Sequence, residues 1–156
     1  MTDYTTLLFE QQNGVAKITL NRPDAANALN LDMARELMQA AIHCDEDPTV
    51  RCVLITASGK MFCAGGDIQS FAEAGDKVGH LAKEITAYLH AAISRFARMD
   101  APLITAINGA AAGAGFSLAI AGDLALAGAS AKFTVAYTAI GASPDGSSSY
   151  YLPRLV

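Results

Sequence analysis

Two short apolar runs, "RCVLITAS" at residues 51–58 and "PLITAIN" at residues 102–108, are each followed by a glycine-rich segment. Runs of this length, rich in Val, Ile and Leu, are typical of strands buried on both faces of a parallel sheet. Parallel neighbours need a long crossover connection, usually a helix. The sequence therefore predicts an α/β fold in which buried strands alternate with helices.

The segments around these two strands fit that expectation. Residues 7–20 contain two β-prone runs joined by Asn13-Gly14, the dipeptide most typical of a two-residue hairpin turn. Apolar residues recur at helical spacing after Asn30, a good N-cap, and again over residues 76–98. A short helix is expected at residues 113–122, and further strands at 124–128 and 132–136. The 156 residues contain no linker, so one domain is predicted.

The glycine-rich segments at residues 59–68 and 108–118 are candidates for a binding site. Glycine at the end of a strand lets a ligand approach the backbone and leaves main-chain N–H groups free to contact it. The second segment also opens a helix, whose first N–H groups carry the positive end of the helix dipole. Glycine-rich strand ends also arise from packing alone. Neither segment matches a P-loop or a dinucleotide-binding motif, because Met61 follows the lysine of the first and Leu118 replaces the third glycine of the second.

Two residues are candidate nucleophiles, and the sequence argues against both. "GFSLA" approaches the nucleophile elbow G-x-S-x-G around Ser117, but that arrangement needs a downstream histidine, and all three histidines lie upstream. Ser117 is therefore expected to be a small residue packed inside a helix. Cys63 is a lone cysteine between Phe62 and Ala64 and is expected to be a small apolar filler.

Charge and cysteine content exclude several other classes of protein. The net charge is -4 and the 11 Lys and Arg are dispersed, so neither a nucleic acid nor a membrane surface is an expected partner. Three cysteines without C-x-x-C spacing argue against a disulfide framework and a structural zinc site, and no metal is expected. The chain does not open with a basic segment followed by an apolar run, so we expect no secretory signal and a cytoplasmic location.

Four segments carry a family resemblance: "NRPDAANALN", "SGKMFCAGGDI", "INGAAAGAGFSLAIAGDLALAGASAKF" and "IGASPDGSSSYYLPRLV". In this order they resemble the crotonase superfamily, which includes enoyl-CoA hydratases and isomerases. The resemblance implies a crotonase-like spiral of repeated ββα units that binds an acyl-CoA substrate, usually as a homotrimer or hexamer. Residues 1–156 would form the acyl-CoA-binding core, without the helical region that follows in family members. Coenzyme A would be part of the substrate, and no separate cofactor is implied.

The resemblance also assigns roles to the two glycine-rich segments. The thioester carbonyl becomes an enolate, and two backbone N–H donors, which match Gly66 and Ala114, hold its oxyanion. Many relatives have glycine at the second place, but Ala114 still supplies its N–H. Tyr137 would shape the acyl pocket. The other substrate-binding positions implied by the resemblance are Ala25, Ala26, Ala28, Phe62, Cys63, Ala64, Gly65, Asp67, Ile68 and Gly113.

The acid implied by the resemblance is Asp145. Hydratases of this family use two glutamates, but the matching places here hold Ser117 and Tyr137, so ordinary hydration is not expected. Asp145 lies in a Pro-Asp-Gly turn, where aspartate often serves the turn alone. It also matches the aspartate of the phenylacetate-pathway ring-epoxide isomerases, the type that the chain most resembles. We therefore expect isomerisation, with Asp145 as the base that removes a proton and returns it to another carbon.

Two alternatives stay open. His90 matches the histidine that 4-chlorobenzoyl-CoA dehalogenases use beside their aspartate, although those enzymes have tryptophan where Tyr137 stands. A helical wheel places His90 opposite the apolar stripe of residues 76–98, which favours a solvent-facing side chain. The second alternative is a non-catalytic crotonase-like binding subunit, which would also lack both glutamates.

Overall fold

The computed structural model describes residues 4–156 and begins with an antiparallel hairpin of β1 (Leu7–Gln12) and β2 (Val15–Leu20). The two residues between the strands, Asn13 and Gly14, have φ values of 53° and 82°, as the turn favoured by Asn-Gly requires. The predicted hairpin is therefore confirmed. Residues 1–3, which open the stretch where no secretory signal is expected, lie outside the described residues.

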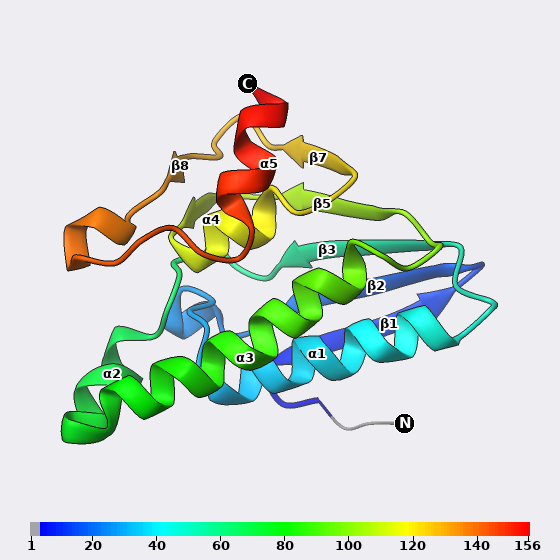
Figure 1. Ribbon diagram of the computed structural model, residues 1–156. Coiled ribbons are helices and arrows are strands. Elements are labelled where there is room, and N and C mark those ends of the chain that lie inside the picture. The colour runs from blue at the N-terminus through cyan, green and yellow to red at the C-terminus, as the bar shows by residue number, and fades with distance from the viewer. Residues whose placement is uncertain (1–3) are drawn as a thin grey trace.

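A five-stranded sheet forms the frame of the fold (Figure 1). From β2 it continues in parallel through β3 (Cys52–Ala57) and β5 (Leu103–Ile107) to β7 (Leu124–Ala127) at its edge. β3 and β5 are the two apolar runs on which the α/β prediction depended, and that prediction is confirmed. The strand order β1-β2-β3-β5-β7 omits the even-numbered strands after β2, because these belong to a second sheet.

The second sheet has three parallel strands, β4 (Met61–Cys63), β6 (Ala110–Ala112) and β8 (Phe133–Thr134). In the successive pairs β3 and β4, β5 and β6, and β7 and β8, the first strand enters the large sheet and the second enters the small one. This alternation produces the expected spiral. The sequence indicated only glycine-rich loops where β4 and β6 lie, because three-residue strands are too short to show a period.

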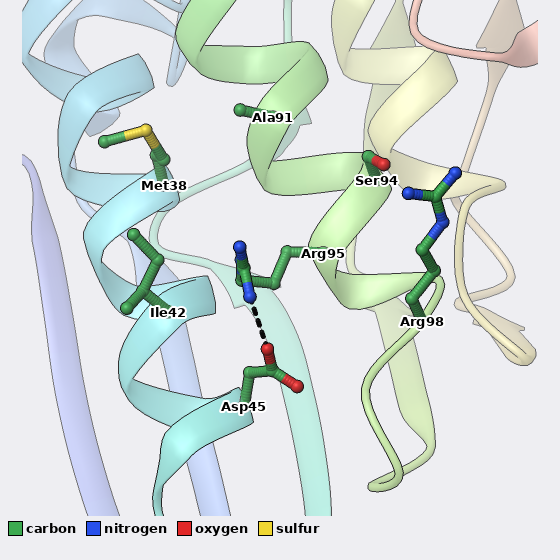
Figure 2. Close-up of a pocket in the computed structure, with 7 residues that line it drawn as sticks. All are labelled: Met38, Ile42, Asp45, Ala91, Ser94, Arg95 and Arg98. Atoms are coloured by element: carbon green, nitrogen blue, oxygen red, sulfur yellow. Dashed lines mark hydrogen bonds and ion pairs between the residues drawn. The ribbon is translucent and has the colours of Figure 1, made fainter.

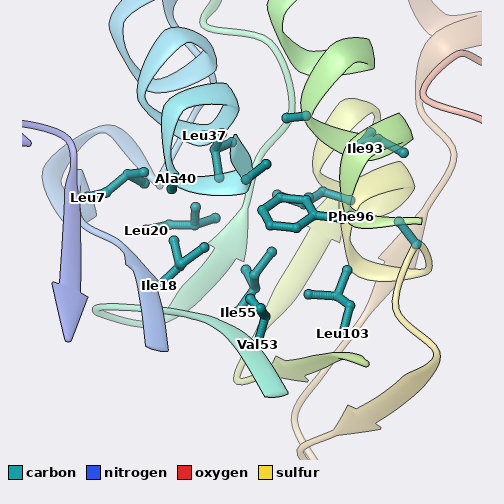
Figure 3. Close-up of a cluster of buried hydrophobic side chains, with 14 of the residues drawn as sticks. Leu7, Ile18, Leu20, Leu37, Ala40, Val53, Ile55, Ile93, Phe96 and Leu103 are labelled. Carbon is teal, nitrogen blue, oxygen red and sulfur yellow. The ribbon is translucent and has the colours of Figure 1, made fainter. Parts of the chain in front are cut away.

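Two long helices, α1 (Leu31–Glu46) and α3 (Val78–Phe96), pack side by side against the large sheet (Figure 1). Asn30 caps α1 as predicted, since its side-chain oxygen accepts the Met33 N–H at 3.0 Å. Within residues 4–156, no helix is long and apolar enough to cross a membrane. The hydrophobic core lies between the helices and the sheet, and Figure 3 shows its members Ile18, Leu20, Leu37, Ala40, Val53, Ile55, Ile93, Phe96 and Leu103.

The sequence predicted one helix over residues 76–98, but in the structure this helix starts at Val78 and a further short helix precedes it. The structure has α2 (Ile68–Ala74), a 3-10 turn η2 (Gly75–Lys77) and then α3. Gly75 ends α2 with a φ of 51°. α2 was missed because its seven residues are too few to establish a helical period.

Short elements complete the described chain. α4 (Ala114–Ala119) lies within the predicted helix at 113–122, and α5 (Ser148–Leu155) follows the Pro-Asp-Gly turn. Two 3-10 turns, η1 (Pro23–Ala25) and η3 (Tyr137–Ile140), lie in the connections after β2 and β8. From Gly115 to its end, α4 is buried, which fixes it against the two sheets.

Glu36 on α1 attaches the chain before β1 to the helix layer. Its carboxylate accepts four hydrogen bonds, from the backbone N–H and the hydroxyl of both Thr5 and Thr6, at 2.6–2.8 Å. Burial tends to raise the pKa of Glu36, but these hydrogen bonds together outweigh it and hold the pKa below its ordinary value. The ionised carboxylate therefore stabilises the folded protein.

We expect Glu36→Gln to lower the free energy of unfolding at pH 7 by about 2 kcal/mol, because hydrogen bonds to a charged group are lost. Since the folded pKa is depressed, this stability is fully present above the ordinary pKa of 4.5 and is lost as the pH falls through the folded pKa. Urea unfolding from pH 7 to pH 3 should show the variant and the unmodified chain converging in acid. Glu46→Gln, at an exposed position, is the matched control. A constant difference at every pH would contradict the assignment.

Candidate active site

The two glycine-rich segments lie side by side at one edge of the small sheet. β4 and β6 pair in parallel, with Met61 opposite Ala110 and Cys63 opposite Ala111, so the segments that leave them start at the same edge. The approach is so close that a Cβ on Gly115 would collide with the Cys63 carbonyl oxygen. A Cβ on Gly65 would lie 2.8 Å from the Ala112 carbonyl oxygen and 3.6 Å from the Ala114 nitrogen. The absence of side chains here is therefore what brings the two backbones together.

The backbone N–H groups of Gly66 and Ala114, the predicted oxyanion donors, make no hydrogen bond within the described residues. Leu29 pairs with the residues on either side of Gly66, donating to the Gly65 carbonyl at 2.7 Å and accepting the Asp67 N–H at 3.0 Å. In this pattern the N–H of Gly66 points away from Leu29. Ala114 is the first residue of α4, so its N–H has no partner within the helix. Across residues 4–156, neither N–H donates to another group.

The backbone of Asp145 forms the hydrogen bonds of the turn, and its side chain makes separate contacts. Its carbonyl oxygen accepts the Ser148 N–H at 3.1 Å and the Ser148 hydroxyl at 2.9 Å, which starts α5. The carboxylate points elsewhere: Oδ1 accepts the Tyr137 hydroxyl at 2.6 Å, and Oδ2 lies 3.2 Å from His90 Nε2. The turn and the proposed chemistry are therefore compatible.

His90 lies on α3 with 46% of its side chain exposed, as its place opposite the apolar stripe suggested. It nevertheless contacts the site, because the turn at 145–147 passes over this face of α3. Besides Asp145, its Nε2 lies 3.3 Å from the Gly146 N–H. Nε2 accepts the Gly146 N–H when it is unprotonated and donates to Asp145 when it carries a proton.

Ser117 and Tyr137, at the places of the hydratase glutamates, contact each other. Ser117 is fully buried, and its hydroxyl lies 2.8 Å from the phenolic oxygen of Tyr137 in η3. Burial, followed by the hydrogen bond to Asp145, raises the pKa of Tyr137 above its ordinary value. Sequence reasoning did not predict these contacts, although Ser117 lies only three residues after Ala114, on the next turn of the same helix.

The segments predicted to bind coenzyme A lie next to each other. The Ala26 carbonyl accepts the Ala64 N–H at 3.1 Å, beside the contacts of Leu29 with Gly65 and Asp67. The backbone of residues 25–28 is held by Asn27, whose fully buried amide donates to the Ser58 and Met61 carbonyls at 2.8 and 2.9 Å. Asn27 was not among the residues singled out from the sequence, because an asparagine in a loop carries no distinctive pattern.

In the first glycine-rich segment, the side chains of Phe62, Cys63 and Asp67 contribute to packing, helix capping and an ion pair. Phe62 and Cys63 are fully buried in the core, and burial raises the pKa of the Cys63 thiol to about 12. Cys63 is thus the apolar filler that the sequence suggested. Asp67 caps α2 through the Ser70 N–H at 3.1 Å and pairs with Arg22 at 2.8 Å. Burial tends to raise the pKa of Asp67, but these two partners together lower it. Ile68 is 65% exposed.

A separate groove of about 410 Å³ lies between α1 and α3 (Figure 2). It contains the ion pair of Arg95 with Asp45 and none of the predicted site residues. The candidate active site is therefore not this groove but the edge of the small sheet, together with Asp145. Within residues 4–156 no group of three or more His, Cys, Asp or Glu could hold a metal ion.

Residues 10–156 match the enoyl-CoA hydratase/isomerase family, and the chain belongs to this family. The resemblance to the crotonase superfamily is thereby confirmed. A 1,2-epoxyphenylacetyl-CoA isomerase from Escherichia coli K12 is 36% identical over 152 residues, which cover 96% of this chain and 57% of that protein. A 4-chlorobenzoyl coenzyme A dehalogenase-2 from Arthrobacter is 36% identical over 149 residues, covering 94% and 54%.

The solved structures agree with this assignment. The crystal structure of an enoyl-CoA hydratase from Polaromonas sp. JS666 matches with a TM-score of 0.87 at 33% identity, covering 96% of this chain and 58% of that one. The chain thus spans little more than half the length of these relatives.

Proposed function

We propose that this chain forms the core of an acyl-CoA isomerase, with Gly66 and Ala114 as the oxyanion donors and Asp145 as the base. The observation that carries the proposal is the contact between α4 and the acidic turn. Ala114 is the first residue of α4, and Ser117 Oγ, one turn later, lies 2.9 Å from the Asp145 carbonyl oxygen and 2.8 Å from the Tyr137 hydroxyl that contacts the carboxylate. The backbone donor and the carboxylate therefore belong to one small, hydrogen-bonded unit.

In the proposed reaction, Asp145 removes a proton from a carbon near the thioester, and the electron pair left behind forms an enolate. The oxyanion of the enolate accepts hydrogen bonds from Gly66 and Ala114, which lowers the barrier to proton removal. The protonated Asp145 then returns the proton to a different carbon, so the double bond moves and no atom is gained or lost. One carboxylate suffices for both transfers.

The proposed substrate is a coenzyme A thioester. The segments at 25–28 and 64–68 would contact the coenzyme through their backbones, and Gly113 and Tyr137 would border the acyl group. Because Phe62 and Cys63 are buried, we propose that they support this surface rather than contact the ligand. A homotrimer or hexamer and a cytoplasmic location remain parts of the proposal.

A second candidate is dehalogenation of an aryl-CoA. The 3.2 Å contact between His90 Nε2 and Asp145 Oδ2 favours it, since it brings a second base to the carboxylate. In that reaction Asp145 would attack the halogen-bearing carbon, chloride would leave, and water activated by His90 would hydrolyse the resulting ester.

A panel of thioesters tests these functions. We would incubate the full-length chain in D₂O with 2-enoyl, 3-enoyl, ring-epoxide phenylacetyl and 4-chlorobenzoyl thioesters of coenzyme A and analyse each by mass spectrometry. Deuterium uptake with a shifted double bond or rearranged ring is the expected result. Chloride release would instead establish the second candidate. A folded protein that binds coenzyme A but changes no thioester would overturn both and leave a binding subunit.

A further inference from the structure

Ser117, Tyr137 and Asp145 form a closed circuit of hydrogen-bonding atoms. Its members are the hydroxyls of Ser117 and Tyr137 and the Oδ1 and carbonyl oxygens of Asp145. The phenolic oxygen of Tyr137 lies 2.6 Å from Asp145 Oδ1 and 2.8 Å from Ser117 Oγ, and Ser117 Oγ lies 2.9 Å from the Asp145 carbonyl oxygen. Ser117 is fully buried and Tyr137 nearly so, which shields the two hydroxyls from water. The nearest other acceptor for Ser117 is the Gly113 carbonyl, at the longer distance of 3.4 Å.

We propose that Ser117 and Tyr137 are positioning residues whose hydrogen bonds reverse direction as Asp145 passes between its ionised and protonated forms. This proposal rests on the proposed function, in which Asp145 must hold a proton between two transfers. Neither hydroxyl touches the reacting carbon; each acts through the carboxyl group.

When Asp145 is ionised, both its carboxylate oxygens can only accept. The Tyr137 hydroxyl therefore donates to Oδ1, which leaves the phenolic oxygen as an acceptor. Ser117 has one hydrogen and can donate it to the Tyr137 oxygen at 2.8 Å. The Asp145 carbonyl does not lose its partners when Ser117 turns away, because Ser148 still donates to it twice.

When Asp145 carries a proton on Oδ1, the circuit runs the other way. The carboxyl O–H donates to the Tyr137 oxygen, the Tyr137 hydroxyl donates to Ser117 Oγ, and Ser117 donates to the Asp145 carbonyl at 2.9 Å. Each hydroxyl now has one donor and one acceptor, whereas in the ionised form Ser117 donates but accepts no hydrogen bond. No heavy atom has to move, so both forms of the base are satisfied within one buried arrangement.

The backbone at Gly146 keeps the circuit closed. Gly146 has a φ of 57°, and a Cβ there would lie 2.8 Å from the Cβ of Ser117. Glycine therefore lets the turn lie directly against α4, with the Asp145 carbonyl within reach of Ser117.

Two conservative variants and their combination test the proposal. The readout is the titration midpoint of the Asp145 carboxyl, followed by ¹³C NMR of the full-length chain. Tyr137→Phe should raise the midpoint by about one pH unit, because it removes a donor to the ionised form. Ser117→Ala should raise it by a smaller amount when Tyr137 is present and by nothing when Tyr137→Phe is already in place, since Ser117 acts through Tyr137.

The controls separate this effect from others. Tyr150→Phe, at an exposed tyrosine, should leave the midpoint unchanged. His90, the other titratable side chain in contact with Asp145 among residues 4–156, is kept in every variant. If Ser117→Ala does not fold, Ser117→Cys keeps the volume with a much weaker donor and should give the same direction of shift.

Equal shifts from Ser117→Ala in both backgrounds, or no shift from Tyr137→Phe, would overturn the proposal. The midpoint is measured without turnover, so it can fail or succeed independently of the proposed isomerase activity. Where deuterium exchange is observed, its pH profile should move by the same amount as the NMR midpoint. An unmoved profile would show that the circuit plays no part in proton transfer and would also overturn the proposal.

Discussion

Asparagine in place of Asp145 is expected to lower the rate of deuterium exchange into a substrate thioester by about 10²–10⁴-fold. The amide keeps the size of the side chain and can still accept the Tyr137 hydroxyl, but it cannot bind and return a proton. Because the backbone of residue 145 and not its side chain starts α5, the turn should survive the change. Mass spectrometry of the thioester in D₂O measures the rate, and thermal unfolding checks the fold.

Asp100→Asn is the matched control for this prediction. Asp100 is exposed just after α3, so the same chemical change there should leave exchange within a factor of about two. Exchange that persists in Asp145→Asn would assign the proton transfer to another group, and His90 would be the first to examine, because it contacts the same carboxylate.

Proline in place of Ala114 is expected to lower kcat by about 10²–10³-fold, the usual cost of losing one oxyanion donor. Proline removes the N–H, and its ring occupies the space in front of the nitrogen. The first position of a helix tolerates proline, because its N–H has no partner within the helix in any case. The stability of the protein should therefore change much less than kcat, which steady-state kinetics and thermal unfolding can separate.

Ala114→Gly keeps the N–H and should retain most of the activity. If Ala114→Pro were folded and as active as the Gly variant, the oxyanion would not depend on this donor. If both variants lost activity equally, the cause would lie in the conformation of the segment at 113–115 and not in the N–H.

The sequence predicted those structural elements whose residues are strongly apolar, recur at a regular spacing or match a known turn or cap. The hairpin at Asn13-Gly14, the cap at Asn30 and the runs that form β3 and β5 were all confirmed. Of the small sheet, the residues predicted only the strand at 132–136, which contains β8. β4 and β6 exist because glycine lets two backbones approach, and nothing in the residues of β6, three alanines, distinguishes a strand from a loop.

For the candidate site, the sequence predicted positions but no contacts, and the roles of those positions stay predictions. The family motifs indicated Gly66, Ala114 and Asp145, but they did not show that Ser117 and Tyr137 hydrogen-bond to each other and to the acid. These contacts depend on how closely the turn at Gly146 packs on α4, and that closeness is set by tertiary structure. His90 illustrates the same limit, since a helical wheel gave its exposure correctly but not its contact with Asp145.

The close packing of Gly115 on Cys63 also means that the conformational entropy of the two backbone donors is lost on folding and not on substrate binding. A backbone this crowded leaves the segments after β4 and β6 little freedom to separate, so the N–H groups of Gly66 and Ala114 have already lost their conformational entropy when the chain is folded. That entropy is part of the folding free energy and is not subtracted from substrate affinity. The proposed oxyanion site is in this sense preorganised, and its rigidity should be independent of which acyl group is bound.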